Sequence, residues 1–188
     1  MCHFCGKYHT FKNCPLENEM ASFFKKKVGS LMEYYIANNF NCPCCNKKEL
    51  CVINNNSPSL DIICNCGKKI EVKSKCLSVI NLPNNIFLNH GSYIDYINRV
   101  KEEIDLFIVI YAVDRIKKII KIREVLHITH NMLIEDSNIN VIEQDKNRLS
   151  TIIIKDRTKL NSLPLPNCEN TFDFNKYIED FKNKKIDN

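Results

Sequence analysis

The stretch LDIICNCGKKIEVKS, residues 60–74, decides the fold that this sequence predicts. Its first part, Leu60 to Cys64, is apolar and β-prone, and the Cys-Asn-Cys-Gly that follows is typical of a turn. Strand-like sequence resumes at Lys69 and continues to Val79. We therefore expect a β-hairpin whose turn is centred on Cys66.

The same hairpin is expected to gather charged side chains on one face. Asp61 and Glu71 each lie five residues from Cys66, so they are expected to be cross-strand partners with Cβ atoms about 5 Å apart. Glu71 and Lys73 lie two apart in a strand and therefore point to the same side. Two carboxylates, with substrate phosphate and water, suit octahedral Mg²⁺ (or Mn²⁺), which can neutralise developing charge and activate a water. Lys73 is then placed to orient that water or to stabilise the transition state.

These residues resemble the PD-(D/E)xK signature of the restriction-endonuclease-like nuclease superfamily. Asp61 precedes a hairpin that carries Glu71-x-Lys73, and Gly29-x-x-x-Glu33 resembles the acidic motif in the first helix of many members. The resemblance implies an α/β fold with an αβββαβ core and a mixed central sheet, over roughly residues 19 to 122. It also implies that Asp61 and Glu71 hold the metal and that Glu33 contacts it directly or through water. Lys73 is implied to activate the nucleophile.

The assignment depends on the combination of these residues. Glu-x-Lys alone is a very common pattern on a half-exposed strand. The residue before Asp61 is Leu60 where the signature has proline, with Pro58 three positions upstream of Asp61. Glu33 and Asp61 together with Glu71 and Lys73 are what favour a catalytic interpretation over a merely solvated strand.

The remaining sequence is consistent with one α/β domain over residues 17–160. Apolar residues recur at spacings of three and four between about Glu19 and Asn38, as in a core-facing helix. Leu106 to Val113 is apolar on both faces, as expected of a central strand covered on both sides.

Other elements are expected along the chain, with a charged tail at residues 161–188. We expect a helix at 93–103, a strand at 116–122, a late hairpin from 141–142 and 149–154, and a short helix at 174–182 in that tail. The segment 125–134 is ambiguous between helix and strand.

Paired cysteines indicate an embedded metal site at residues 42–67. The chain has eleven cysteines and shows no secretory signal, which favours metal binding over disulfides. Two turns, Cys42-Pro43-Cys44-Cys45 and Cys64-Asn65-Cys66-Gly67, look like a zinc ribbon. The preferred ligands are Cys42, Cys45, Cys64 and Cys66; Cys44 could replace one of the first pair, and Cys51 is a further candidate. Zinc there would connect the tip of the hairpin to the end of the Glu33 helix.

A second zinc site is expected at residues 1–16. The pattern Cys2-x₂-Cys5-x₃-His9-x₄-Cys14 resembles a CCHC zinc knuckle, one residue short between Cys5 and His9. So small a segment can hardly fold without a metal. Its aromatic and lysine residues could stack on unpaired bases and contact phosphates, although a purely structural or protein-binding knuckle would show the same ligands.

Composition restricts the partners and the location. The formal net charge of +5 is compatible with a polyanionic partner, and the resemblance implies that this partner is a nucleic acid, DNA above all. No apolar run approaches the roughly 20 residues that cross a bilayer. We expect an intracellular, reducing compartment (nucleus or cytoplasm) rather than secretion. The resemblance to restriction enzymes and resolvases implies that a homodimer could cut two strands. The alternative function is a non-catalytic zinc protein that binds nucleic acid or a protein partner in transcription or packaging.

Several further residues have both a functional and an ordinary interpretation. Lys75 shares the face of Lys73 and could touch phosphate, but a solvated strand end explains it equally well. His90 could be an auxiliary phosphate contact or a surface residue. His127 and His130, three apart, are interpreted as structural because no acidic or third ligand is evident nearby in the sequence.

Overall fold

The computed structural model describes residues 15–53, 60–77, 82–92, 101–114, 119–144, 149–166 and 171–173. The ligands predicted for the N-terminal knuckle, Cys2, Cys5, His9 and Cys14, lie outside these residues, as do the predicted tail helix and most of the helix expected at 93–103. No helix in the described ranges is long and apolar enough to span a membrane.

The expected first helix is present as α1, Pro15–Asn39, which begins a few residues earlier than the apolar pattern indicates. Val28, Met32 and Ile36, spaced by four, are fully buried against the main sheet. The helix ends where the Asn39 side-chain amide donates to the Tyr35 carbonyl at 2.9 Å, which satisfies one of the carbonyls left open in a last turn. The four-residue spacing therefore sets which side of α1 faces the sheet and which side carries Glu33.

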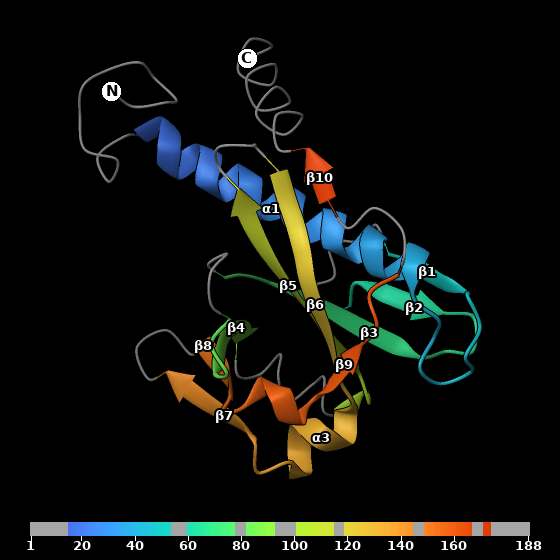
Figure 1. Cartoon of the computed structure of the whole chain (residues 1–188). Coiled ribbons are helices and arrows are strands. Elements are labelled where there is room, and N and C mark those ends of the chain that lie inside the picture. The colour runs from blue at the N-terminus through green and yellow to red at the C-terminus, as the bar shows by residue number, and fades with distance from the viewer. Residues whose placement is uncertain are drawn as a thin grey trace.

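Seven described strands form the main sheet (Figure 1). They are β1 (Leu50–Val52), β2 (Ile62–Cys64), β3 (Lys69–Cys76), β5 (Asp105–Asp114), β6 (Ile119–Ile128), β9 (Asn161–Leu163) and β10 (Thr171–Asp173). Their order is β1-β2-β3-β5-β6-β10, with β9 also paired to β6. β3 and β5 run parallel, and the other neighbours are antiparallel, so the sheet is mixed. The fold is thus mixed α/β, with most of its regular structure in sheets.

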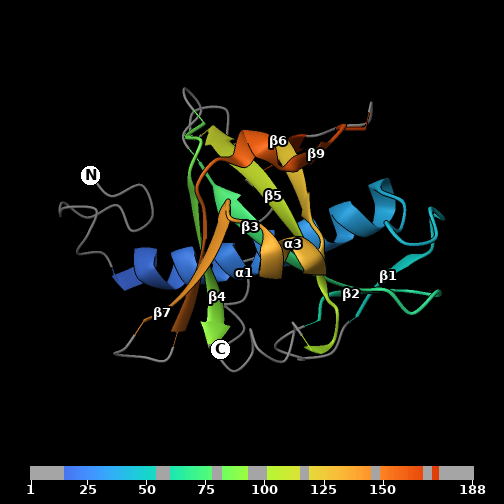
Figure 2. The ribbon, with the colours of Figure 1, turned by 90° about the horizontal axis from the view of Figure 1, so that it is seen from below.

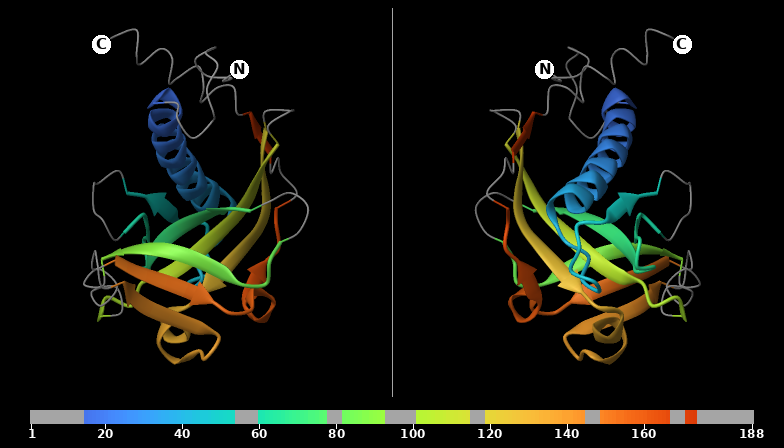
Figure 3. Two further views of the ribbon diagram at one scale, coloured as in Figure 1. Left: turned by 90° about the vertical axis from the view of Figure 1, so that its left-hand side faces the viewer. Right: turned by 90° about the vertical axis from the view of Figure 1, so that its right-hand side faces the viewer.

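A second, three-stranded sheet covers the face of the main sheet opposite α1 (Figure 3). It has the order β4-β8-β7, from β4 (Ile86–Ser92), β8 (Leu149–Ile154) and β7 (Ile139–Gln144). Figure 2 shows these strands in front of the main sheet and α1 behind it. The predicted hairpin of residues 141–142 and 149–154 is therefore confirmed as β7 and β8.

β5 separates two hydrophobic cores because its alternate side chains enter opposite layers. Phe107 and Val109 pack with α1, whereas Ile108 and Ile110 pack with the second sheet. The first eight residues of β5 are buried. The expectation of a central strand covered on both faces is confirmed.

The C-terminal part of the chain adds to the main sheet beyond residue 160. β9 pairs with Val125–His127 of β6, and β10 pairs with Ile119–Lys121 of the same strand. The sheet therefore extends into the segment for which the sequence predicts a charged tail. The ambiguous segment 125–134 divides into the end of β6 and the short helix α3 (His130–Glu135), which begins after the Thr129 N-cap. A single turn of 3-10 helix, η2 (Arg157–Lys159), precedes β9.

Candidate active site and cysteine cluster

The β2–β3 hairpin has the register that the sequence predicts. Ile62 is paired with Ile70, and Ile63 is paired with Lys69, and extending this register by one residue would set Asp61 opposite Glu71. Asp61 lies just before β2, and its backbone N–H donates to the Ile70 carbonyl at 3.2 Å. Its side chain turns to β3, where Oδ2 accepts from the Val72 N–H at 2.7 Å. The Asp61 carboxylate therefore lies against the backbone between Glu71 and Lys73.

Glu71 and Lys73 form an ion pair on the face of β3 that they share. The Glu71 residue is only 2% exposed, and its neighbour across the parallel β3–β5 pair is the buried Leu106. The Lys73 side chain is 27% exposed and so reaches the edge of the site. A buried carboxylate is costly unless a positive charge compensates it, and Lys73 supplies one such charge.

Glu33 comes to the same region from α1. Burial raises the pKa of Glu33, the charge of Asp61 raises it further, and the Lys73 ammonium acts in the opposite direction. Glu33 therefore lies within electrostatic range of Asp61 and Lys73. The helix thus carries a third carboxylate within electrostatic range of the hairpin, and its contact with a metal stays a prediction.

The charge of this group of residues is unbalanced. Glu33, Asp61 and Glu71, if all ionised, exceed the single Lys73 ammonium by two negative charges. Nearby carboxylates disfavour each other's ionisation, and the charge of Asp61 adds to burial in raising the pKa of Glu33. A hard divalent cation prefers oxygen ligands of this kind and would compensate the excess. These oxygen donors are of the kind that Mg²⁺ or Mn²⁺ prefers, but the three carboxylates do not lie within 4.8 Å of one another as the four cysteine sulfurs do.

Lys75 has a role that the sequence does not indicate. Its Nζ donates to the Phe87 carbonyl at 2.7 Å, so it connects β3 to β4 of the second sheet. In this structure Lys75 contributes to the packing of two sheets instead of extending into solvent beside Lys73. The side chain of His90, also considered from the sequence, lies outside the described residues.

His127 is buried in an ion-pair network with Asp105. Its Nε2 lies 2.9 Å from Asp105 Oδ2, and its ring stacks on Phe107 at a centroid distance of 4.8 Å. Lys68 Nζ reaches Asp105 Oδ1 at 2.8 Å, and the His130 N–H donates to the same oxygen. Burial alone would raise the pKa of Asp105, but the hydrogen bonds from His127, Lys68 and the His130 backbone hold it below its ordinary value. A structural interpretation of His127 fits these contacts, and Asp105 is the acidic partner that sequence reasoning missed.

Four cysteines converge at the other end of the hairpin. The sulfur atoms of Cys42, Cys45, Cys64 and Cys66 all lie within 4.8 Å of one another. Cys42 Sγ is 3.6 Å from Cys66 Sγ, and Cys45 Sγ is 3.6 Å from Cys64 Sγ. Tetrahedral zinc with Zn–S bonds of about 2.3 Å places its sulfurs about 3.8 Å apart. The cluster can therefore hold a tetrahedral metal ion, and its members are the four ligands preferred from the sequence.

Two tight turns hold these sulfurs in place. In the first, the Cys42 N–H donates to the Lys47 carbonyl at 2.8 Å, and Asn46 adopts a left-handed φ of 57°. In the second, the Gly67 N–H donates to the Cys64 carbonyl at 2.8 Å, and Gly67 has a φ of 88°, which glycine adopts without strain. The first turn follows α1 and the second joins β2 to β3. The cluster thus connects the helix of Glu33 to the hairpin of Asp61 and Glu71.

The thiols differ in their protonation chemistry. Burial raises the pKa of Cys64 to about 12, whereas the Lys68 backbone N–H lowers the pKa of Cys66 to about 6. A bound metal deprotonates its thiol ligands outright, so it would remove this difference. Cys44 and Cys51, the alternative ligands, are both exposed and are not members of the cluster.

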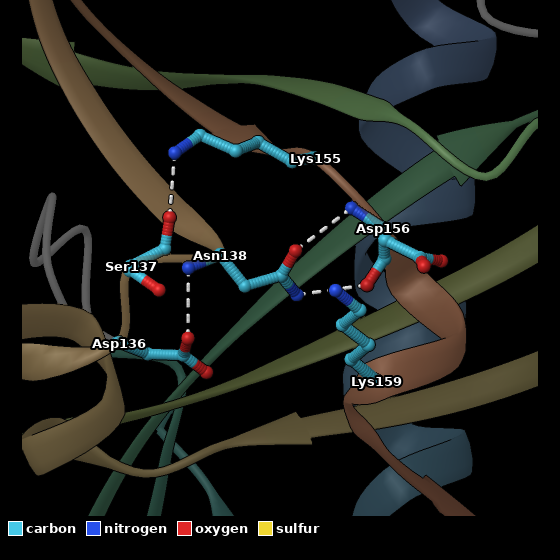
Figure 4. A pocket seen from close by; sticks show the side chains of 6 residues that line it. All are labelled: Asp136, Ser137, Asn138, Lys155, Asp156 and Lys159. Carbon is cyan, nitrogen blue, oxygen red and sulfur yellow. Dashed lines mark hydrogen bonds between the residues drawn. The ribbon is translucent and has the colours of Figure 1, made fainter.

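A separate polar pocket lies between the start of β7 and the end of β8 (Figure 4). It is lined by Asp136, Ser137, Asn138, Lys155, Asp156 and Lys159. Lys155 Nζ donates to the Ser137 carbonyl at 2.6 Å, and the Asn138 side chain exchanges hydrogen bonds with the Asp156 backbone at 2.8 and 2.9 Å. These bonds join two loops to each other, which gives the lining a structural role.

Comparison with known sequences gives one family. The model of the DpnI family, described as Dam-replacing, matches residues 10–164. The match includes Glu33, the hairpin and the whole four-cysteine cluster, and it begins after Cys2 and Cys5. No curated protein matches the chain. Because the family match covers far more than half of the sequence, the chain belongs to the DpnI family, a restriction-endonuclease-like family whose membership indicates a nuclease.

Proposed function

We propose that this protein is a divalent-metal-dependent deoxyribonuclease that hydrolyses phosphodiester bonds within DNA. The observations that support the proposal are the register of the β2–β3 hairpin, the hydrogen bond from the Val72 N–H to the Asp61 carboxylate on β3, and the ion pair between Lys73 and Glu71. The approach of Glu33 to Asp61 and Lys73 supports it. Family membership supports the nuclease class.

Asp61 and Glu71 would hold Mg²⁺ or Mn²⁺, and Glu33 would complete the metal shell or orient a water. The bound metal would neutralise charge on the phosphate and lower the pKa of a bound water. Lys73 has the donors to orient the attacking water, and its charge favours the additional negative charge of the pentacoordinate transition state. Its partial exposure leaves the ammonium within reach of a substrate at the site edge.

Zn²⁺ in the four-cysteine cluster would have a structural role. The cluster lies between the end of α1 and the tip of the hairpin, so it would fix the distance between Glu33 and the two hairpin carboxylates. Such positioning matters because displacement of catalytic groups by about 1 Å can cost a hundredfold in rate. A second Zn²⁺ in the knuckle of residues 1–16, homodimerisation and a reducing intracellular location remain predictions from the sequence.

The test is cleavage of linear, circular, single-stranded and branched DNA with Mg²⁺ or Mn²⁺, followed by EDTA. We expect metal-dependent cleavage by the wild type that EDTA stops, and loss of cleavage in Asp61→Asn. Both proteins should be purified identically, so that a contaminating nuclease would appear in both. Tight DNA binding without cleavage under any of these conditions would contradict the proposal and favour a non-catalytic nucleic-acid-binding protein.

A further inference from the structure

An aromatic pocket lies between the second half of α1 and β10 (Figure 1). It has a volume of about 160 Å³. Its lining consists of three aromatic rings, one leucine and two amides, which belong to Tyr34, Tyr35, Phe172, Leu31, Asn38 and Asn39. Pockets for whole small-molecule ligands measure about 300–1,000 Å³, so this one suits a single ring system.

The three rings differ in exposure. Tyr35 is only 4% exposed and meets Phe172 edge to face, with ring centroids 6.0 Å apart and ring planes at 87°. Tyr34 is 46% exposed, although it is a large aromatic side chain. Tyr35 and Phe172 thus form a packed wall of the pocket, whereas Tyr34 presents almost half of its surface to solvent.

The pocket lies around the helix from the candidate active site. Tyr34 follows Glu33 directly in α1, and a helix turn takes 3.6 residues, so the two side chains are little more than a quarter turn apart. Lys27 lies seven residues before Tyr34 and Asn38 four residues after it, which places all three on one face of α1. A nucleic-acid strand bound over Tyr34 would therefore pass beside Glu33.

The groups in this pocket are those with which proteins bind unpaired bases. Every base has a π-face that can stack on an aromatic ring such as that of Tyr34. The exposed side-chain amide of Asn38 has both donor and acceptor atoms for a base edge. The ammonium of Lys27 on the same face suits a neighbouring phosphate. A paired base cannot enter, because it is already stacked on both faces within the duplex.

We propose that this pocket binds one unpaired base of a DNA strand beside the cleavage site, with Tyr34 as the ring on which the base stacks. The inference rests on the proposed function, because it takes the substrate to be DNA. It adds a base-binding site outside the carboxylates and lysine of the hairpin. It also predicts that DNA with unpaired bases is bound more tightly than a fully paired duplex.

The experiment measures the affinity of the full-length protein for fluorescein-labelled DNA by anisotropy, without added Mg²⁺ or Mn²⁺. The two probes are a single-stranded oligonucleotide and a blunt duplex of the same length. The variants are Tyr34→Ala, Tyr34→Phe and Phe87→Ala. Phe87 is the matched control because its side chain is 49% exposed but lies on β4, in the sheet on the opposite side from α1.

Tyr34→Ala should weaken binding of the single strand by about fivefold or more, which is the lower limit for the loss of one base–aromatic stack. Its binding of the duplex should stay at the wild-type level. Tyr34→Phe keeps the ring and should bind both probes as the wild type does. Phe87→Ala should do the same, because the lost ring lies far from the pocket.

An equal loss on both probes in Tyr34→Ala would overturn the inference, because Tyr34 would then contact the DNA backbone and not a base. Wild-type affinity of Tyr34→Ala for the single strand would overturn it as well, as would a similar loss in Phe87→Ala. The nuclease proposal has its own readout. A wild type that cuts DNA while Tyr34→Ala keeps its single-strand affinity would refute this inference alone, and selective binding through Tyr34 without any cleavage would refute the nuclease proposal alone.

Discussion

Replacement of Glu71 by glutamine would separate the chemistry of the site from the stability of the fold. Glutamine keeps the volume of the buried side chain but removes the negative charge, which is paired with Lys73. Lys73 is partly exposed and can turn its ammonium to solvent when the pair is broken. The substitution therefore removes a proposed metal ligand without opening a cavity in β3.

The two expected effects differ greatly in size. Glutamine removes the buried charge, and the Lys73 ammonium that is left is partly exposed and can be solvated, so Glu71→Gln should change the free energy of unfolding by about 1 kcal/mol or less. For a chain of this length that corresponds to a shift in Tm of about 2–4 °C. Loss of a metal ligand removes several kcal/mol of transition-state stabilisation. At about 4 kcal/mol the cleavage rate falls about 1,000-fold.

The assay measures cleavage of supercoiled plasmid with Mg²⁺ and thermal unfolding on the same samples. Glu124→Gln is the control, because it breaks an ion pair outside the candidate active site. Glu124 lies on β6 and its partner Arg157 lies on η2, and both side chains are only 14% exposed. Breaking this pair leaves Arg157 partly buried and should destabilise the fold by about 3 kcal/mol. Its cleavage below the unfolding transition should stay at the wild-type rate.

The reasoning would be refuted by Glu71→Gln protein that cuts plasmid as fast as the wild type. It would also be refuted by a large fall in Tm, because Glu71 would then be a structural ion-pair residue.

Three further predictions concern the groups around this site. Glu33→Gln should raise Tm in metal-free buffer at pH 7 and should lower cleavage. The rise in Tm is expected because the folded-state pKa of Glu33 is raised above its ordinary 4.5, so its contribution to stability is lost as pH rises. An unchanged or lower Tm would contradict this. Asp105→Asn should cost about 2–3 kcal/mol at pH 7 by urea unfolding. Because the folded-state pKa of Asp105 is lowered from 3.8, this difference should shrink as pH falls through acid values, and a difference independent of pH would contradict it. Cys64→Ser should lose cluster zinc by metal analysis and unfold at a lower temperature, and full zinc retention would show that Cys64 is not a ligand.

The hairpin could be predicted from sequence because its geometry is local. The turn at Cys66 and Gly67 fixes the pairing, and a shift of one residue would move every side chain to the other face. The same argument applies to the four cysteines, whose spacing within each turn limits which sulfurs can converge. The hairpin register needs no contact between distant segments, and the four-cysteine group needs only that its two turns meet.

The network of Asp105 could not be predicted in this way. Its partner Lys68 lies just before β3, and its partner His127 lies in β6. Only the pairing of β5 with both of these strands brings the three residues together. Lys75 is similar, because its contact with Phe87 depends on how β4 packs across the main sheet. Sequence spacing carries no information about such contacts.

The sequence by itself determined the hairpin register, the identity of the carboxylates and lysine on it, the four-cysteine group and the apolar central strand. These follow from the alternation of side chains along a strand and from turn chemistry, which act over a few residues. Only the tertiary structure decided that Glu33 approaches Asp61, that a second sheet covers the face opposite α1, and that β9 and β10 extend the main sheet. The physical reason is that packing between layers depends on burying apolar faces that are far apart in the chain, and no local pattern specifies which faces meet.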